Sequence, residues 1–285
     1  MLNTENMLEC KKLTRTYNVF LQKKVFALQN INLEIKKGEV FALIGPNGSG
    51  KTTLFKILLG FITRFSGEFI LNGSRNGEDL KIKEKIGFVA EQPYFYPDLN
   101  FAEAIKFCGS FYSNKEIVKK ENIEKLILKV QMEEHSKKKI SEYSKGMLQR
   151  LSIASAIIND PDLLIMDEPT SGLDPFVGDE IKNIILDLKK QGKTIIISSH
   201  LMSHTQDVCD SIGILYKGKL VKTGTLDDIT RTSDQGIAIF ETENKEIDFW
   251  QDSFKKAGIK LKSIDYLKND LEESLKLIVD REKEK

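Results

Sequence analysis

The sequence is poor in cysteine and contains no long apolar run. Its 285 residues include three cysteines, Cys10, Cys108 and Cys209, which lie far apart and form no C-x-x-C pair. This pattern excludes a disulfide framework and a zinc knuckle, and it is typical of a protein from a reducing compartment. The longest apolar runs, such as residues 163–166, are much shorter than the roughly 18 to 20 residues that span a membrane. We therefore expect that the chain does not cross a bilayer.

The sequence also has no marked excess of charge of either sign. The sequence has 43 Lys and Arg residues and 42 Asp and Glu residues, so its formal net charge is +1. Nucleic-acid-binding proteins usually carry a basic excess or a basic stripe, and we therefore expect no nucleic-acid partner. Residues 1–12 lack a basic segment followed by an apolar one, so no signal peptide is expected. With 40% hydrophobic and 30% charged residues, the composition is that of an ordinary globular protein.

Short apolar runs and helical patterns alternate along most of the chain. Five runs are typical of strands that are buried on both faces: 40–44, 86–90, 163–166, 194–197 and 212–216. Apolar residues recur every three or four positions in 101–112 and 123–130, which predicts two helices that each bury one face. Asn100 and Glu103 have the spacing of a capping box before the first helix. The alternation predicts an α/β domain over residues 1–230 with a mostly parallel sheet, which follows antiparallel strands near the N-terminus.

A second compositional zone begins after a polar linker at residues 230–233. The four segments after the linker have the patterns of a strand, a helix, a strand and a helix: 236–242, 248–256, 259–266 and 271–279. We predict that residues 231–285 form a small α+β domain with a modest core of its own.

Eight consecutive residues match the phosphate-binding pattern G-x-x-x-x-G-K-[ST] between the predicted strand 40–44 and a helical run. They are Gly45, Pro46, Asn47, Gly48, Ser49, Gly50, Lys51 and Thr52. The glycines let the backbone turn its N–H groups inward, and the N-terminus of the next helix adds positive charge, which together make a cradle for phosphate. Lys51 can reach the β- and γ-phosphates, the Thr52 hydroxyl is placed to bind Mg²⁺, and Thr53 can touch the α-phosphate.

Two adjacent carboxylates, Asp167 and Glu168, follow the apolar run 163–166. If this run is a parallel strand, they lie at its C-terminal end, where α/β sheets bind ligands. An acidic pair at a strand end is commonplace and can be a solvated junction, but the phosphate-binding loop in the same chain favours a catalytic interpretation. We predict that Asp167 holds Mg²⁺ through water and that Glu168 polarises the attacking water as general base.

In their order along the chain, these motifs resemble those of the nucleotide-binding subunit of ATP-binding-cassette (ABC) transporters. The resemblance covers residues 7–230. The family's Q-loop glutamine, a ligand of metal and water that also couples to the membrane partner, corresponds to Gln92. Residues 171–174 resemble the family's D-loop, which ends here at Asp174, and His200 resembles the switch histidine that contacts the γ-phosphate. The resemblance thus places Gln92, Asp174 and His200 near the nucleotide.

The family's signature, usually Leu-Ser-Gly-Gly-Gln, corresponds here to Tyr-Ser-Lys-Gly-Met at residues 143–147. In the family this segment opens a helix whose N-terminus faces the γ-phosphate bound by the other subunit. Ser144 and Gly146 match the signature, which implies that they contact nucleotide. Lys145 and Met147 depart from it: a lysine here can add positive charge near the phosphate, whereas Met147 cannot offer an amide to the ribose. The variant resembles that of bacterial drug and antibiotic exporters.

Two aromatic features each allow two interpretations. Tyr17 stands where the family stacks an aromatic ring on adenine, but it can also be a packed residue of the first sheet, and Phe20 is a nearby competitor. Pro-Tyr-Phe-Tyr-Pro at residues 93–97 follows Gln92. These rings either form a docking groove for a partner or fill the junction between the core and a helical subdomain.

The resemblance implies an ATP-hydrolysing subunit that powers a transporter, with ATP and Mg²⁺ bound between two chains. One chain supplies the catalytic residues Lys51, Gln92, Glu168 and His200, and a second ATPase chain, identical or different, supplies its signature. The helical subdomain is expected over about 93–155. Because no span is expected, transport requires separate multispanning permease subunits, which places the chain at the cytoplasmic face of the membrane.

An exporter is the main interpretation, and two alternatives stay open. An importer ATPase is possible because the membrane subunits determine the direction of transport. A cassette ATPase that acts on ribosomes or DNA without a membrane partner is the other alternative. Ribosome-acting relatives usually carry two cassettes on one chain, and chromosome-type relatives insert a long coiled coil between the P-loop and the signature. This sequence has one P-loop, at Lys51, and no such insertion before Ser144.

Overall fold

The computed structural model describes residues 5–19, 23–200 and 205–230. The chain divides into two compact units, Met1–Ile229 and Thr230–Lys285. The predicted small α+β domain over residues 231–285 lies outside the described residues, and so does Phe20.

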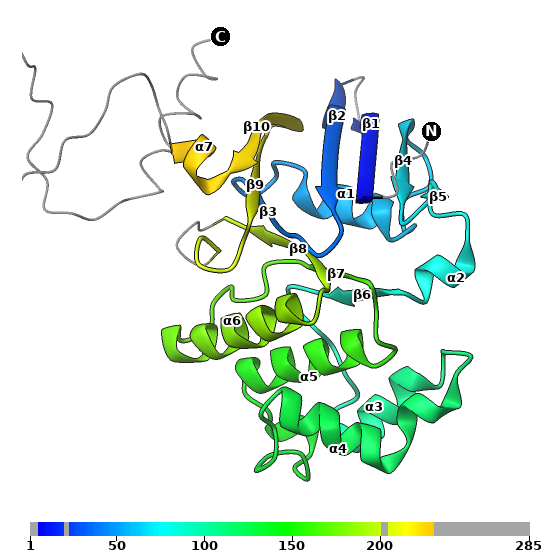
Figure 1. The fold of residues 1–285 in the computed structure, drawn as a ribbon, viewed down its shortest axis with the longest axis vertical. Coiled ribbons are helices and arrows are strands. Elements are labelled where there is room, and N and C mark those ends of the chain that lie inside the picture. The colour runs from blue at the N-terminus through cyan, green and yellow to red at the C-terminus, as the bar shows by residue number, and fades with distance from the viewer. Residues whose placement is uncertain (1–4, 20–22, 201–204, 231–285) are drawn as a thin grey trace, which may run out of the picture. The chain divides into compact units, whose positions relative to one another are not determined.

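A six-stranded, mostly parallel sheet forms the centre of this unit, with the strand order β10-β9-β3-β8-β7-β6 (Figure 1). The strands are β3 (Val40–Ile44), β6 (Ile86–Val89), β7 (Leu163–Met166), β8 (Thr194–Ser199), β9 (Ser211–Tyr216) and β10 (Lys219–Thr225). Only β10 pairs in antiparallel fashion in this sheet. The five predicted apolar runs are five of these strands, and β3, β7 and β8 are completely buried, as strands covered on both faces are.

A second sheet is antiparallel and has the order β2-β1-β4-β5. Its strands are β1 (Asn6–Val19), β2 (Lys23–Lys36), β4 (Ser66–Leu71) and β5 (Ser74–Arg75). Helix α1 (Lys51–Leu58) lies between the two sheets, and its Leu54 and Phe55 pack into one apolar core with Leu28 of β2 and Phe41 of β3. The predicted antiparallel strands near the N-terminus are therefore confirmed. They cover one side of α1, the helix that begins at the end of the phosphate-binding motif.

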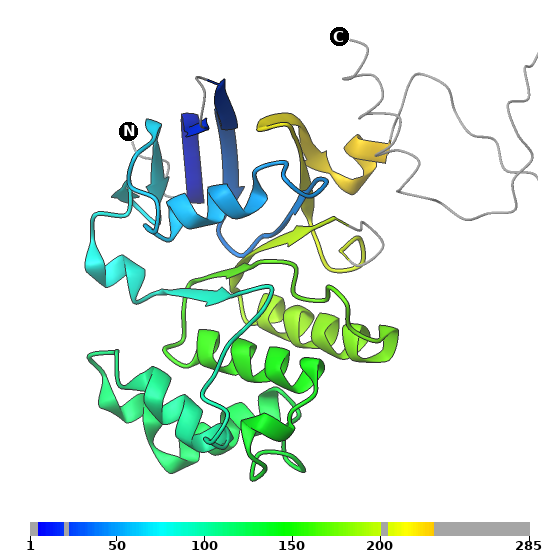
Figure 2. The same cartoon turned by 180° about the vertical axis from the view of Figure 1, so that it is seen from behind.

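The remaining helices lie mainly on the other side of the central sheet (Figure 2). They are α2 (Leu80–Lys83), α3 (Phe101–Gly109), α4 (Lys120–Lys129), α5 (Lys145–Ile157), α6 (Pro175–Lys190) and α7 (Leu226–Thr230), with short 3-10 turns at Lys115–Val118 and Ile140–Glu142. The capping box predicted at Asn100 and Glu103 is present, with bonds of 2.9 and 3.1 Å. Helix α3 ends at Gly109, earlier than predicted, and α4 begins earlier, at Lys120.

Within residues 5–19, 23–200 and 205–230, no helix combines the length and the apolar composition that a membrane span requires.

Strand order brings the predicted motifs to one edge of the sheet. β3, β8 and β7 are neighbours and run parallel, so their carboxyl ends lie side by side. In the register, Ile44 is opposite Ser199, and Met166 is opposite Ile197. The three segments that follow these strands begin at Gly45, Asp167 and His200, and this edge is where open α/β sheets bind ligands.

Candidate nucleotide site

The loop after β3 requires two of its glycines because other backbone segments approach it closely. A Cβ atom on Gly45 would lie 2.1 Å from the carbonyl oxygen of Leu215, and one on Gly50 would lie 2.4 Å from that of Ala27. Gly50 also has a φ of 115°, a conformation that side chains disfavour. The loop leads directly into α1, whose N-terminal N–H groups carry partial positive charge. The structure thus places the predicted loop, residues 45–50, at the positive end of a helix, a geometry that suits an anion.

Lys51, the first residue of α1, is paired with Glu168 at the centre of the site. Both side chains are buried, with 6% and 8% of their surface exposed. The Lys51 Nζ donates a hydrogen bond of 2.6 Å to the Gly45 carbonyl and lies 3.3 Å from Oε1 of Glu168. A buried ammonium and a buried carboxylate are each costly alone, and the pairing offsets that cost.

Asp167 is held by two hydroxyl groups from different elements. Thr52 in α1 donates to its Oδ2 at 3.0 Å, and Ser198 in β8 donates to its Oδ1 at 2.6 Å. Asp167 is itself 5% exposed, and its backbone N–H bonds the carbonyl of Val89 at 2.8 Å. The predicted metal ligands Thr52 and Asp167 are therefore side by side, although 115 residues separate them in sequence.

Glu168 and His200 form the other half of the site. Oε2 of Glu168 lies 2.8 Å from Nδ1 of His200 and accepts a second bond of 3.3 Å from the His200 backbone N–H. Glu168 has a φ of 49°, in the left-handed region, which residues other than glycine rarely adopt and which is enriched at functional sites. Its Oε1 is buried and accepts no hydrogen bond among the described residues. The predicted base and the predicted switch histidine are thus in direct contact.

The chemistry of these groups fits a magnesium nucleotide. The Ser49 hydroxyl is buried and has no hydrogen-bond partner among the described residues, so it can bond a phosphate oxygen. The Thr52 and Asp167 oxygens are hard ligands of the kind that Mg²⁺ prefers. No group of three or more His, Cys, Asp or Glu side chains suited to a metal ion occurs in the described ranges. A Mg²⁺ at Thr52 and Asp167 would accordingly complete its shell with water and phosphate, as Mg²⁺ usually does.

Other predicted site residues lie outside this contact network. Gln92 is exposed in the loop after β6, and within the described ranges it bonds neither Thr52 nor Asp167. Tyr17, in β1, is 37% exposed, and the Arg15 guanidinium lies 4.4 Å from the centre of its ring. The Tyr17 ring therefore lies partly exposed on the surface of the antiparallel sheet.

The signature residues and Asp174 occupy helix N-termini. Ser144 is the N-cap of α5 and accepts a bond of 3.3 Å from the Met147 N–H, while Gly146 lies in the first turn. Asp174 is the N-cap of α6 and accepts a bond of 2.9 Å from the Phe176 N–H. In the described part of the chain, no hydrogen bond connects Ser144 or Gly146 to residues 45–53 of the same chain.

Ser198 is a residue of the site to which the sequence assigned no role. It is fully buried, donates to Asp167, and accepts a bond of 2.9 Å from the Glu168 N–H. It therefore connects the two carboxylate residues to β8. The position of Ser198 in the sequence could have indicated this role. A hydroxyl at the end of a strand that is buried on both faces needs a polar partner, and the carboxylates after β7 provide one.

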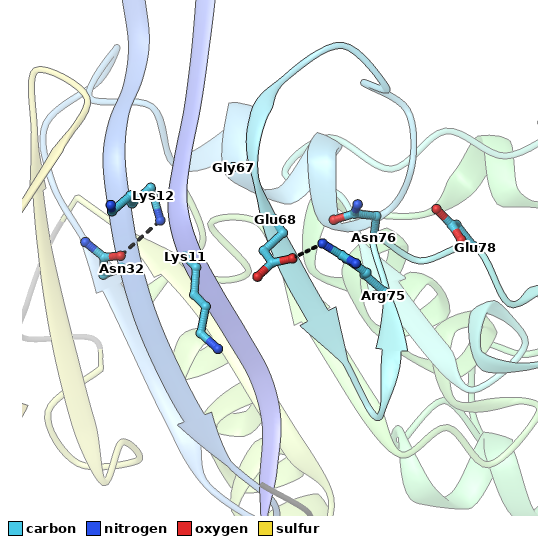
Figure 3. A pocket seen from close by; sticks show the side chains of 8 residues that line it. All are labelled: Lys11, Lys12, Asn32, Gly67, Glu68, Arg75, Asn76 and Glu78. Carbon is cyan, nitrogen blue, oxygen red and sulfur yellow. Dashed lines mark hydrogen bonds and ion pairs between the residues drawn. The ribbon is translucent and has the colours of Figure 1, made fainter. Parts of the chain in front are cut away.

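A separate hollow of about 700 Å³ lies on the small antiparallel sheet (Figure 3). Its lining carries both signs of charge, and Arg75 donates to Glu68 at 2.5 Å. Its lining residues are Lys11, Lys12, Asn32, Gly67, Glu68, Arg75, Asn76 and Glu78. None of the predicted site residues lines it, so this hollow is distinct from the nucleotide site.

Comparison with known proteins agrees with this geometry. Residues 28–171 match the family model described as ABC transporter. The chain is 40% identical to the lantibiotic transport ATP-binding protein SrtF of Streptococcus pyogenes over 75% of this chain and 89% of SrtF. It is 35% identical to the linearmycin resistance ATP-binding protein LnrL of Bacillus subtilis over 78% of this chain and 70% of LnrL.

A solved structure with the same fold is a dimer in a post-hydrolysis state, the ATP-binding cassette MJ0796 bound to ADP and Pi. Its TM-score is 0.69 at 30% sequence identity, and the match covers 77% of this chain and 99% of that cassette.

We predict that Ser198→Ala lowers the rate of ATP hydrolysis by about tenfold or more, because it leaves a buried Asp167 oxygen without its donor at a cost of about 1–3 kcal/mol. Steady-state phosphate release by the purified chain measures this. Ser155→Ala is the matched control, because the Ser155 hydroxyl bonds a carbonyl of its own helix at 2.8 Å. Equal rates for both variants would contradict the role of Ser198.

Proposed function

The chain belongs to the ATP-binding proteins of ABC transporters, and from this premise we propose that it is the ATP-hydrolysing subunit of an exporter. It works as a dimer that encloses two MgATP molecules and is coupled to separate permease subunits. One observation carries the proposal: Lys51, Thr52, Asp167, Glu168 and His200 come from three segments and are joined by direct contacts at one sheet edge.

Each predicted site residue, within this network or outside it, has a role in the proposed reaction. The loop from Gly45 to Gly50 and the Lys51 ammonium bind the phosphates, and Thr53 approaches the α-phosphate. Tyr17 packs against the base. Thr52, Asp167 and Gln92 hold Mg²⁺, which when bound neutralises phosphate charge.

The proposed chemistry takes place between Glu168 and His200. Glu168 accepts a proton from water as the water oxygen bonds to the γ-phosphorus, and the bond from that phosphorus to the β-phosphate oxygen breaks. ADP and inorganic phosphate are the products. The contact of 2.8 Å with Nδ1 of His200 orients the carboxylate, and the histidine supports the γ-phosphate.

The dimer completes the site from the other chain. Ser144 and Asp174 are exposed at the starts of α5 and α6, where they are accessible to the nucleotide of a second chain. The N-terminus of α5 has positive character and suits a phosphate. Ser144 and Gly146 thus bind the nucleotide held by the partner's P-loop, and the dimeric cassette with ADP and Pi supports this arrangement.

An aromatic surface beside Gln92 supports a permease partner. We call Tyr94, Tyr96, Phe107 and Phe111 the aromatic strip; these side chains are 83%, 54%, 44% and 76% exposed. Phe107 stacks edge-on with both Tyr96 and Phe111 at 5.3 Å between ring centres. Phe95 instead is partly buried and packs against the apolar core that α3, α4, α5 and α6 share. Exposed rings in a contiguous group are typical of protein docking sites.

Export at the cytoplasmic face is the proposed direction and location. SrtF is named for lantibiotic transport and LnrL for linearmycin resistance, and resistance to an antibiotic is commonly achieved by its removal. The substrate contacts belong to the permease.

We predict that Glu168→Gln lowers kcat by about a hundredfold or more, because the amide cannot accept the water proton, while the variant still binds ATP. Phosphate release and ATP titration measure the two effects. Glu121→Gln, an exposed residue of α4, is the control. Hydrolysis by Glu168→Gln at the parent rate would show that another group is the base.

Metal dependence provides a second test of the site. Chelation of divalent cations is expected to abolish hydrolysis, and Thr52→Ala is expected to raise the Mg²⁺ concentration needed for half-maximal activity by about tenfold, because one oxygen ligand is lost. The measurement is phosphate release against free Mg²⁺. An unchanged Mg²⁺ requirement in Thr52→Ala would show that Thr52 is not a ligand.

The partner is tested through the aromatic strip. We predict that Phe107→Ser with Phe111→Ser lowers the recovery of permease subunits with the affinity-purified chain by about tenfold, because apolar contact area is lost. Phe61→Ser is the matched control, since Phe61 is 70% exposed after α1. Equal recovery of both variants would contradict the docking surface, and recovery with ribosomes in place of a membrane protein would contradict the transporter role.

A further inference from the structure

The signature helix begins with a cation at an unfavourable position. Lys145 is the first residue of α5, where the helix dipole is positive and repels an ammonium. The Lys145 Nζ donates a hydrogen bond of 2.5 Å to the backbone carbonyl of Ser171. This carbonyl provides partial negative charge that the helix N-terminus does not. The lysine therefore connects α5 to the segment between Glu168 and α6.

That segment is a tight turn that starts at the proposed catalytic base. The Ser171 N–H bonds the Glu168 carbonyl at 3.0 Å, so the Lys145 ammonium is two hydrogen bonds away from the Glu168 backbone. Gly172 follows with a φ of 62°, and a Cβ at this position would lie 2.7 Å from the Lys145 Nζ. The absence of a side chain at Gly172 leaves space for the ammonium.

Two further contacts fix α5 on α6, and the two helices lie side by side in both views (Figures 1 and 2). A Cβ on Gly146 would lie 2.6 Å from Cγ1 of Val177, so the helices approach closely there. Arg150 forms an ion pair with Glu180, and both side chains are largely buried. The first two turns of α5 are thus held at separate points along the chain from Ser171 to Glu180.

We propose that Lys145 is a positioning residue that couples the two nucleotide sites of the dimer, an inference that rests on the proposed function. Ser144 contacts the nucleotide of the partner chain, whereas Glu168 acts on the nucleotide of its own chain. Lys145 joins the two through Ser171. When nucleotide draws the start of α5 toward it, the turn after Glu168 moves with the helix, and the base reaches its working position. Lys145 therefore acts within its own chain, not as a phosphate ligand of the other chain.

The first experiment measures the connection itself in the full chain. Lys145→Met removes the donor, and Lys145→Arg retains one. Lys120→Met is the matched control because Lys120 is the first residue of α4 and pairs with Glu124 at 3.8 Å. We expect hydrogen exchange of the amides in residues 168–174 to rise about tenfold in Lys145→Met, which is the effect of losing a charge-assisted bond, and to stay near the parent rate in the other two variants.

The same variants are compared in catalysis. Lys145→Met is expected to lower kcat about fivefold or more, in the range of coupling between sites, while the affinity for ATP stays within about twofold. Lys145→Arg is expected to restore kcat. A parent rate of exchange and a parent kcat in Lys145→Met overturn the proposal. If the parent chain neither binds nor hydrolyses ATP, the proposed function fails, whereas the exchange experiment still tests the connection.

Mixed dimers decide whether Lys145 acts within its own chain. Each dimer pairs one chain that has Glu168 with one chain that carries Glu168→Gln, so hydrolysis is confined to a single site. In the first dimer Lys145→Met is on the chain that has Glu168, and in the second it is on the Glu168→Gln chain. We expect the first dimer to be about fivefold slower than the second. Equal rates, or a slower second dimer, overturn the proposal, and the latter result assigns the lysine to the partner's phosphate.

Discussion

The contact between Lys51 and Glu168 is the interaction on which the rest of the site depends. It joins the start of α1 to the end of β7, and both charged groups are buried. Such a pair is stable only when its geometry is fixed, because either charge alone would be strongly destabilised by its surroundings. The parallel pairing of β3, β8 and β7 fixes that geometry. In the proposed reaction Lys51 exchanges this carboxylate for phosphate, so nucleotide binding releases Glu168 to act with His200.

The two sides of the central sheet have different tasks. On one side, the antiparallel sheet and α1 share a core and hold the phosphate cradle in place. On the other side, α3, α4, α5 and α6 share a second core, which carries the signature and the aromatic strip. The nucleotide site lies where the strand ends separate the two cores. A contact such as that of Lys145 with Ser171 is therefore well placed to carry changes from the helical side to the catalytic edge.

Sequence patterns predicted the strands well because short apolar runs indicate burial directly, whereas the assignment of individual residues to nucleotide stays a prediction. The apolar runs 40–44 and 163–166 coincide with β3 and β7, and Gly45 and Gly50 stand where other backbones leave no room for a side chain. The role of Ser198 could not be predicted, since it arises from the pairing of β7 with β8. The same holds for the contact of Lys145: its place in the sequence indicated only that it can add positive charge near the phosphate, and its ammonium bonds a carbonyl 26 residues along its own chain. Local patterns do not encode such long-range contacts.

The central claim is that one chain holds most of the catalytic groups but becomes an ATPase only when a second chain completes the site. The most direct test is the specific activity of the purified chain across a wide range of protein concentration, with the mass of the species measured by sedimentation at each point. We expect activity per chain to rise with the fraction of dimer and to reach a plateau when all chains are dimeric. Full and constant activity from a chain that sediments as a monomer would contradict the account.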